Sequence, residues 1–181
     1  MPGIIVGVDG SGHSQQALRW AIQEALVRRA PLTVLTVHQT IIGWAGGPVS
    51  YPGDKTATEQ ARKAAQDETD TVLEELAGQH PDSVTVEAVS GIPAQALLNA
   101  ADNANADMIV VGSRGAGGFA SLLMGSVSTQ VAQHAHCPVV VIPADERELH
   151  RVLTMFAGQR SAVPPLITQS ACPPSACRSR A

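Results

Sequence analysis

The chain carries, at residues 108–128, the sequence MIVVGSRGAGGFASLLMGSVS. Its first four residues are apolar without interruption, which is typical of a strand buried on both faces of a sheet. A glycine-rich segment follows, and from Ser126 to His136 apolar residues recur at helical spacing. A buried strand that leads through such a loop into a helix is one step of an alternating α/β fold. This stretch therefore predicts a parallel sheet covered by helices.

The residues on either side repeat the alternation of strand and helix. We predict strands at 4–8, 32–37, 84–89, 108–111 and 138–142, and helices from Ser14 to a break at Pro31 and at 56–78, 93–103 and 126–136. The strand at 84–89 alternates polar and apolar residues, so we expect it at an edge of the sheet. Ligands of parallel sheets bind beyond the carboxyl ends of the strands, which points to residues 9–12, 37–39 and 112–126.

The length of 181 residues allows one domain with a remainder. Residues 1–143 hold 7 basic and 13 acidic side chains, whereas residues 144–181 hold 5 and 3. We therefore predict a domain at 1–143 and a C-terminal extension at 144–181. Within the extension, helical spacing of apolar residues indicates a short amphipathic helix at 146–157, and the composition from Ser161 onward indicates disorder.

The composition argues against several classes of protein. No apolar run approaches the roughly 18 residues of a membrane span, so we expect a soluble protein without a membrane partner. An aromatic content of 3% and a net charge of −4 argue against a nucleic-acid partner. Three cysteines are too few for a disulfide framework, and Met1 leads into an apolar strand without a basic leader, so we expect a cytoplasmic location.

The glycine-rich segment suits an anion, although glycines that only make turns are the simpler alternative. Glycines let the backbone approach a phosphate, and the N–H groups at the predicted helix start, Ser126 to Ser128, attract negative charge. A Walker A loop is excluded because neither Lys55 nor Lys63, the two lysines of the chain, follows a glycine. A loose dinucleotide fingerprint beginning at Gly115 follows the fourth strand instead of the first, so we treat it as coincidence.

The full spacing Gly112-x2-Gly115-x9-Gly125-Ser126 resembles the nucleotide-binding pattern of the universal stress protein family. The resemblance extends from Ile4 to Pro143. It is carried by a first strand that ends in Asp9 near Ser11, by VGSRG at 111–115, by GSVS at 125–128 and by CPVVVI at 137–142. It implies a flavodoxin-like three-layer α/β sandwich with a five-stranded parallel sheet of order 3-2-1-4-5, and a homodimer formed through the last strand, 138–142.

The resemblance also implies an adenine nucleotide as ligand. Members with this glycine pattern bind ATP, whose phosphates carry Mg²⁺ or Mn²⁺, and some members bind cyclic AMP instead. Carried over position by position, Asp9 would hydrogen-bond the ribose. The aliphatic side chains near adenine would be Val8, Val37 and Val111. The residues at ribose and phosphates would be Gly112, Gly115, Gly125, Ser126, Val127 and Ser128.

Three polar residues of the predicted site have a structural alternative. Asp9 could close a turn after the strand, Ser11 could cap the following helix, and Arg114 could stay solvated instead of meeting a terminal phosphate. The six histidines show no metal-ligand spacing, and no residues form a catalytic constellation. We therefore predict no metal site made by side chains, no catalytic residues, and at most slow ATP hydrolysis.

The predicted function is that of a cytoplasmic ATP-binding protein that regulates stress adaptation through nucleotide-dependent contacts with an unidentified protein partner. A nucleotide-independent dimeric interaction module, a cyclic AMP binder and a slow ATPase are the alternatives. The segment 39–54 is rich in glycine and proline, and we predict that it is a loop that closes over the adenine as a lid.

Overall fold

A computed structural model describes residues 3–39, 54–76, 80–115 and 124–143. It contains a five-stranded, wholly parallel sheet of order β3-β2-β1-β4-β5. The strands are β1 (Ile4–Val8), β2 (Leu32–Gln39), β3 (Val84–Gly91), β4 (Met108–Gly112) and β5 (Val139–Ile142). The expected order 3-2-1-4-5 and the expected edge position of β3 are confirmed.

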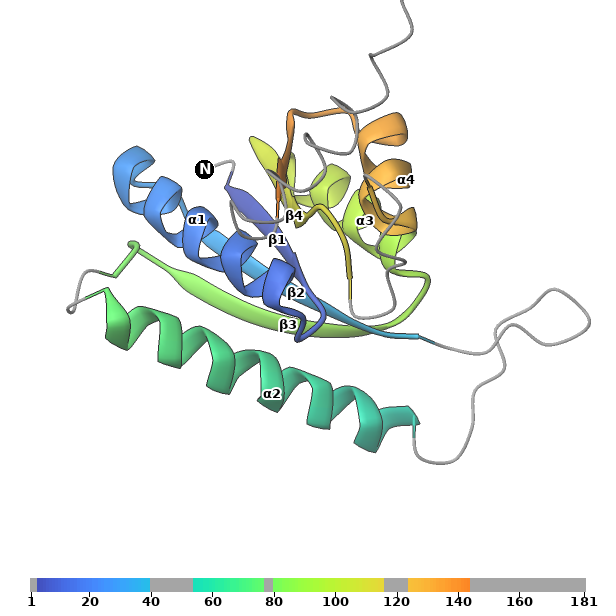
Figure 1. Ribbon diagram of the computed structural model, residues 1–181, viewed down its shortest axis with the longest axis horizontal. Helices are drawn as coiled ribbons and strands as arrows, with labels where there is room; N and C mark the ends of the chain where they lie inside the picture. Colours follow the sequence, from blue (N-terminus) through green and yellow to red (C-terminus); the bar gives the residue numbers. More distant parts are fainter. Residues whose placement is uncertain (1–2, 40–53, 77–79, 116–123, 144–181) are drawn as a thin grey trace, which may run out of the picture.

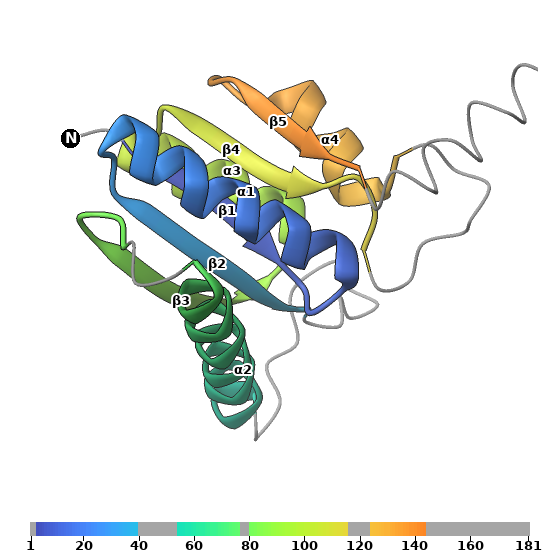
Figure 2. The same ribbon diagram turned by 60° about the vertical axis from the view of Figure 1, so that its left-hand side comes forward.

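The described residues form four helices, which cover both faces of the sheet. They are α1 (Gly12–Arg28), α2 (Asp54–Glu75), α3 (Pro93–Ala104) and α4 (Ser126–His134). Helices α1 and α2 lie on one face, and α3 and α4 lie on the other (Figures 1 and 2). The three-layer flavodoxin-like sandwich implied by the family resemblance is therefore confirmed.

The uninterrupted apolar runs of the central strands follow from this layering. Successive strand residues point to opposite faces of a sheet, so a strand between two helical layers must be apolar at every position. In β1, Ile4 and Val6 are buried under α1, whereas Ile5 is buried on the side of α3 and α4. Strand β3 lies at an edge and keeps the alternating burial that its sequence predicts.

Local sequence sets the helix ends. Helix α1 begins after Ser11, whose Oγ accepts a hydrogen bond from the Ser14 N–H at 3.3 Å. It ends at Arg29, which adopts a left-handed conformation two residues before Pro31. Helix α4 ends at His134 instead of the predicted His136, because Ala135 is already extended as the chain turns into β5.

Three predicted features lie outside the described residues. They are the lid at 39–54 apart from its two end residues, the amphipathic helix at 146–157, and the disordered remainder of the extension. Across the parts of the chain that the structure does describe, no helix is both long and apolar enough to span a membrane.

Candidate functional site

A cavity of about 730 Å³ opens at the carboxyl ends of β1, β2 and β4. The chain runs from β1 outward to β3 and then returns to place β4 on the other side of β1, so this is the point where the strand order reverses. Its volume lies in the range of roughly 300–1,000 Å³ that is usual for small-molecule sites. The lining residues are Gly7, Val8, Asp9, Ser14, Leu35, Thr36, Val37, His38, Ala61, Pro93, Leu97, Val111, Gly112, Arg114, Gly115, Gly125, Ser126, Val127 and Ser128.

The structure places eleven of the twelve sequence-predicted site residues in this lining, and Ser11 is the exception. The Ser11 side chain caps α1, which is the structural alternative named for it above. Its backbone N–H still takes part in the site's geometry, because it donates to Oδ1 of Asp9 at 3.0 Å. The turn after β1 thus fixes the Asp9 carboxylate at the mouth of the cavity.

The cavity has an apolar side and a polar side. Leu35 and Val37 point to the face that α3 and α4 cover, where Leu97 and Gly7 also lie. Because strand residues alternate, Thr36 and His38 point to the face of α1 and α2. The apolar side of the cavity therefore lies against α3, and the polar side lies toward α1 and α2.

Two glycines of the predicted pattern are required by close contacts. A Cβ at Gly112 would lie 2.9 Å from the carbonyl carbon and oxygen of His13, so helix α1 can seat against β4 only where residue 112 has no side chain. A Cβ at Gly115 would collide with Oδ2 of Asp9. Gly112 thus serves the packing of the fold, and Gly115 leaves room for the carboxylate that faces the cavity.

Hydrogen bonds join the two ends of the segment 113–125. The Gly125 N–H donates to the Ser113 carbonyl at 2.7 Å. The hydroxyl of Ser128 is buried and lies 3.0 Å from both the Ser113 and the Gly125 carbonyl oxygens. Since a hydroxyl has one proton, that proton is engaged in closing this loop.

The start of α4 supplies an electropositive edge to the cavity. Gly125 is the N-cap and makes no side-chain capping bond. The first N–H groups of a helix lack intrahelical acceptors and carry the positive end of the helix dipole. Arg114 lines the same side of the cavity. An anion would therefore be favoured at the α4 end of the cavity.

Sequence reasoning missed several lining residues. Pro93 and Leu97 of α3, Ala61 of α2 and Ser14 of α1 come from elements far apart in the sequence. Ser14 and Pro93 lie at helix starts next to strand ends, and that position could have suggested them. Ala61 carries no sequence signal, because it is one of many alanines on its helix.

A second carboxylate, that of Glu68, is influenced by the charge of Asp9. Glu68 of α2 is half-buried, and its Oε1 has no hydrogen-bond partner in the structure. Burial raises the pKa of the Glu68 carboxyl above its ordinary value, the negative charge of Asp9 raises it further, and a hydrogen bond from the Gln15 side chain lowers it. Within the described ranges, no group of three or more His, Cys, Asp or Glu side chains could hold a metal ion.

Comparison with known proteins points to one family. The sequence model described as the universal stress protein family matches residues 2–143. A universal stress protein of Mycolicibacterium smegmatis is 35% identical over 149 residues, which cover 82% of this chain and 50% of that relative. One from Mycobacterium tuberculosis is 35% identical over 142 residues, which cover 77% of this chain and 47% of the relative. The chain thus spans about half the length of these curated relatives.

Solved structures agree with the sequence comparison. A universal stress protein of Lactobacillus plantarum superposes with a TM-score of 0.64 at 26% identity, covering 78% of this chain and 97% of that one. A universal stress protein solved in complex with cyclic AMP superposes with a TM-score of 0.57 at 26% identity, covering 80% and 98%. Family model, relatives and fold agree, and the chain belongs to the universal stress protein family.

Proposed function

We propose that this chain binds an adenine nucleotide, ATP carrying Mg²⁺ or Mn²⁺, in the cavity at the end of the sheet. One observation carries the proposal: a single cavity combines the Asp9 carboxylate, which directly follows β1, with aliphatic walls and the N-terminus of α4. A nucleotide needs these three environments for its ribose hydroxyls, its base and its phosphates. The universal stress protein solved with cyclic AMP shares this fold at 26% identity, which supports the same class of ligand.

The polarity of the cavity orients the proposed ligand. Phosphates would lie at the first turn of α4 and near Arg114, because that end is electropositive. The ribose would meet Asp9, and the base would lie on the apolar side among Val37, Val111 and Leu97. Gly112, Gly115, Gly125, Ser126 and Val127 would offer backbone to the ribose and phosphates, whereas Ser128 and Ser11 would support that backbone from behind.

In this proposal the protein binds ATP and regulates stress adaptation. It hydrolyses the bound ATP slowly at most. Hydrolysis requires a group that orients water and cations that stabilise the developing charge. Asp9 is the carboxylate in the described cavity lining, and the proposal assigns it to the ribose. The nucleotide would then act by altering contacts with a protein partner in the cytoplasm during stress.

We also propose that the chain forms a homodimer through β5. This strand lies at an edge of the sheet, and each of its four residues is only half-buried. Among the described residues β5 pairs with β4 alone, and a sheet edge without a further strand is a template for a second strand. The extension at 144–181 would then start beside the dimer edge.

Equilibrium binding of labelled ATP and cyclic AMP tests the nucleotide proposal. We expect saturable binding of one molecule per chain and a loss of affinity of at least roughly tenfold in Gly115→Val, because a side chain there would displace the Asp9 carboxylate. Gly12→Ala is the matched control, since a Cβ at Gly12 meets nothing within 4 Å. If neither nucleotide binds saturably, the chain is a nucleotide-independent interaction module instead. Tighter binding of cyclic AMP than of ATP would make cyclic AMP the physiological ligand.

A further inference from the structure

On the face of the sheet that α1 and α2 cover, burial decreases toward β5. Val6, Val110 and Val140 are partners in one row across β1, β4 and β5, and all three contribute to the same core cluster. Val6 and Val110 are fully buried, whereas Val140 is only half-buried, and so is Ile142 farther along β5. Helix α1 lies mainly over β1 and β4, and Figure 2 shows β5 beyond its flank. Among the described helices, none lies over this face of β5.

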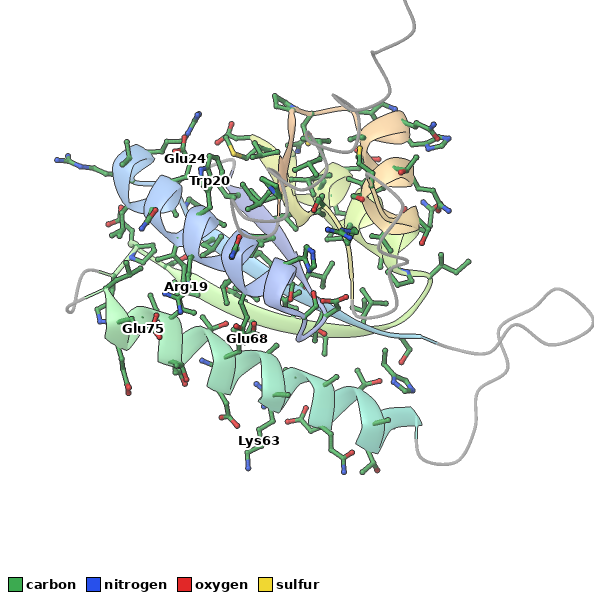
Figure 3. All side chains as sticks on the ribbon, in the orientation of Figure 1. Arg19, Trp20, Glu24, Lys63, Glu68 and Glu75 are labelled. Carbon is green, nitrogen blue, oxygen red and sulfur yellow. The ribbon has the colours of Figure 1, made fainter. Side chains whose placement is uncertain are left out.

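The flank of α1 beside β5 carries two further apolar side chains. Trp20 is half-buried at the margin of the core cluster, and Figure 3 shows it on the side of α1 away from Arg19 and α2. Val27 follows seven residues later, which places it on the same side of the helix, and it is 81% exposed. Apolar side chains gathered on one surface indicate a contact surface, whereas single ones do not. We call this surface the β5 margin, and its residues are Trp20, Val27, Val140 and Ile142.

The chain itself supplies a segment with a matching apolar stripe. Residues 144–181 follow directly after the β5 end of the domain and lie outside the described residues. The helix predicted at 146–157 has apolar residues at i, i+3, i+4 and i+7, which lie on one side of a helix. They are Leu149, Val152, Leu153 and Phe156. An amphipathic helix needs an apolar surface on which to bury such a stripe.

The topology of the sheet favours the β5 margin as that surface. Each of the strands β1 to β4 is followed by a helix that packs back on the sheet, and residues 143–145 would give β5 a connection of ordinary length to a helix of its own. A helix that returns after β5 runs opposite to the strands and therefore parallel to α1. Leu149 and Phe156 would be about 10 Å apart along it, and Trp20 and Val27 are separated by the same number of residues on α1. The two apolar stripes thus match in length and in direction.

We propose that residues 146–157 form a fifth helix that docks on the β5 margin of their own chain and completes the layer made by α1 and α2. The apolar stripe covers Val140 and Ile142 and contacts Trp20. This inference goes beyond the proposed function and does not depend on a bound nucleotide. The docked helix covers a side-chain face of β5 and does not use its outward backbone edge, where the proposed second copy would pair.

Acrylamide quenching of Trp20 fluorescence in the full chain measures whether the β5 margin is covered. Trp44, the other tryptophan of the chain, is replaced by Trp44→Phe in every sample. We expect Leu153→Asp and Phe156→Asp each to raise the quenching constant roughly twofold, because a charge in the apolar stripe releases the helix and exposes the indole. Thr154→Asp is the matched control, since it adds the same charge on the opposite side of the predicted helix and should leave quenching unchanged. Equal quenching in the parent and all variants overturns the inference.

A second measurement identifies the copy that supplies the helix. In an equal mixture of ¹³C-labelled and unlabelled chains, isotope-filtered NMR separates contacts within one chain from contacts between chains. We expect nuclear Overhauser effects between the Phe156 ring and the Ile142 methyl groups within one chain only. Contacts between chains, or no contact at all, overturn the inference. Thermal unfolding verifies the fold of each variant, and it should stay cooperative because the substituted residues of the extension lie outside the core clusters.

Discussion

At the scale of single residues, the glycines of one motif have different tasks. The backbone of His13 in α1 leaves no room for a side chain at Gly112. The carboxylate of Asp9 leaves no room for one at Gly115. The spacing of the motif suggests a phosphate loop for all of them, yet one neighbour is the first turn of helix α1 and the other is a carboxylate that lines the cavity. A glycine pattern in a sequence indicates positions that exclude a side chain. It does not indicate which neighbouring atoms exclude it.

These different tasks predict opposite phenotypes for two alanine substitutions. Gly112→Ala should lower the free energy of unfolding by about 1–3 kcal/mol, because the new Cβ presses on the α1 backbone. Gly115→Ala should change it by less than about 0.5 kcal/mol, since residue 115 is exposed, but should weaken ATP binding by roughly tenfold. Chemical denaturation and calorimetric titration of both variants test this, and the reverse assignment of effects would contradict it.

Because Glu68 is half-buried, we predict that its contribution to the free energy of unfolding depends on pH. Its folded-state pKa is raised by burial and then by Asp9, so the folded chain holds this proton more tightly than the unfolded chain does. Stability from this group is therefore greatest below the ordinary pKa of a glutamate and decreases as pH rises through the folded-state value. Glu68→Gln should be more stable than the parent at pH 7, and the difference should vanish near pH 4. Denaturation midpoints across this range test the sign, and a variant less stable at pH 7 would refute it.

At the scale of elements, helix termini build the site. The start of α1 holds the turn that carries Asp9, the start of α3 contributes Pro93, and the start of α4 presents its N–H groups. All three follow strands of a parallel sheet, so they gather at the edge where those strands end. The sequence places the strand ends well, and for that reason it predicts the location of the site.

A substitution at Ser11 tests whether its side chain caps helix α1 or binds the ligand. Its hydroxyl accepts the Ser14 N–H, so Ser11→Ala should cost about 1 kcal/mol of stability. The Ser11 backbone N–H that holds Asp9 survives the substitution, so ATP affinity should change by less than roughly twofold. Parallel denaturation and binding measurements separate the two roles. A large loss of affinity with normal stability would assign Ser11 to the ligand.

At the scale of the whole molecule, the apolar runs and their spacing predict the positions of all five strands. The family resemblance predicts their order in the sheet. The structure agrees with the predicted positions and with the predicted order. Strands β2 and β3 extend to Gln39 and Gly91, beyond the predicted 37 and 89, because pairing with each other continues past the apolar residues. The cavity wall from Ala61 and Leu97, and the influence of the Asp9 charge on Glu68, arise when α2 and α3 pack on the sheet. No local pattern encodes these contacts.

The open edge of β5 predicts a dimer. The carbonyls of Pro138 and Ile142 accept hydrogen bonds from β4, and the parallel ladder turns the backbone groups of Val141 outward. Val141→Pro removes an outward N–H and should convert a dimer to a monomer while the chain stays folded. Sedimentation equilibrium of parent and variant measures this. A parent chain that is monomeric at tens of micromolar would exclude the proposed interface.

The central claim is that an adenine nucleotide occupies the cavity between Asp9 and the start of α4. A titration of ¹⁵N-labelled protein with ATP and Mg²⁺, followed by NMR, tests it most directly because it reports both binding and location. We predict saturable shifts of the amides of Gly112, Gly115, Gly125 and Ser126, with Val27 at the far end of α1 unaffected. Shifts confined to residues outside the cavity, or no shifts at millimolar ATP, would contradict the account.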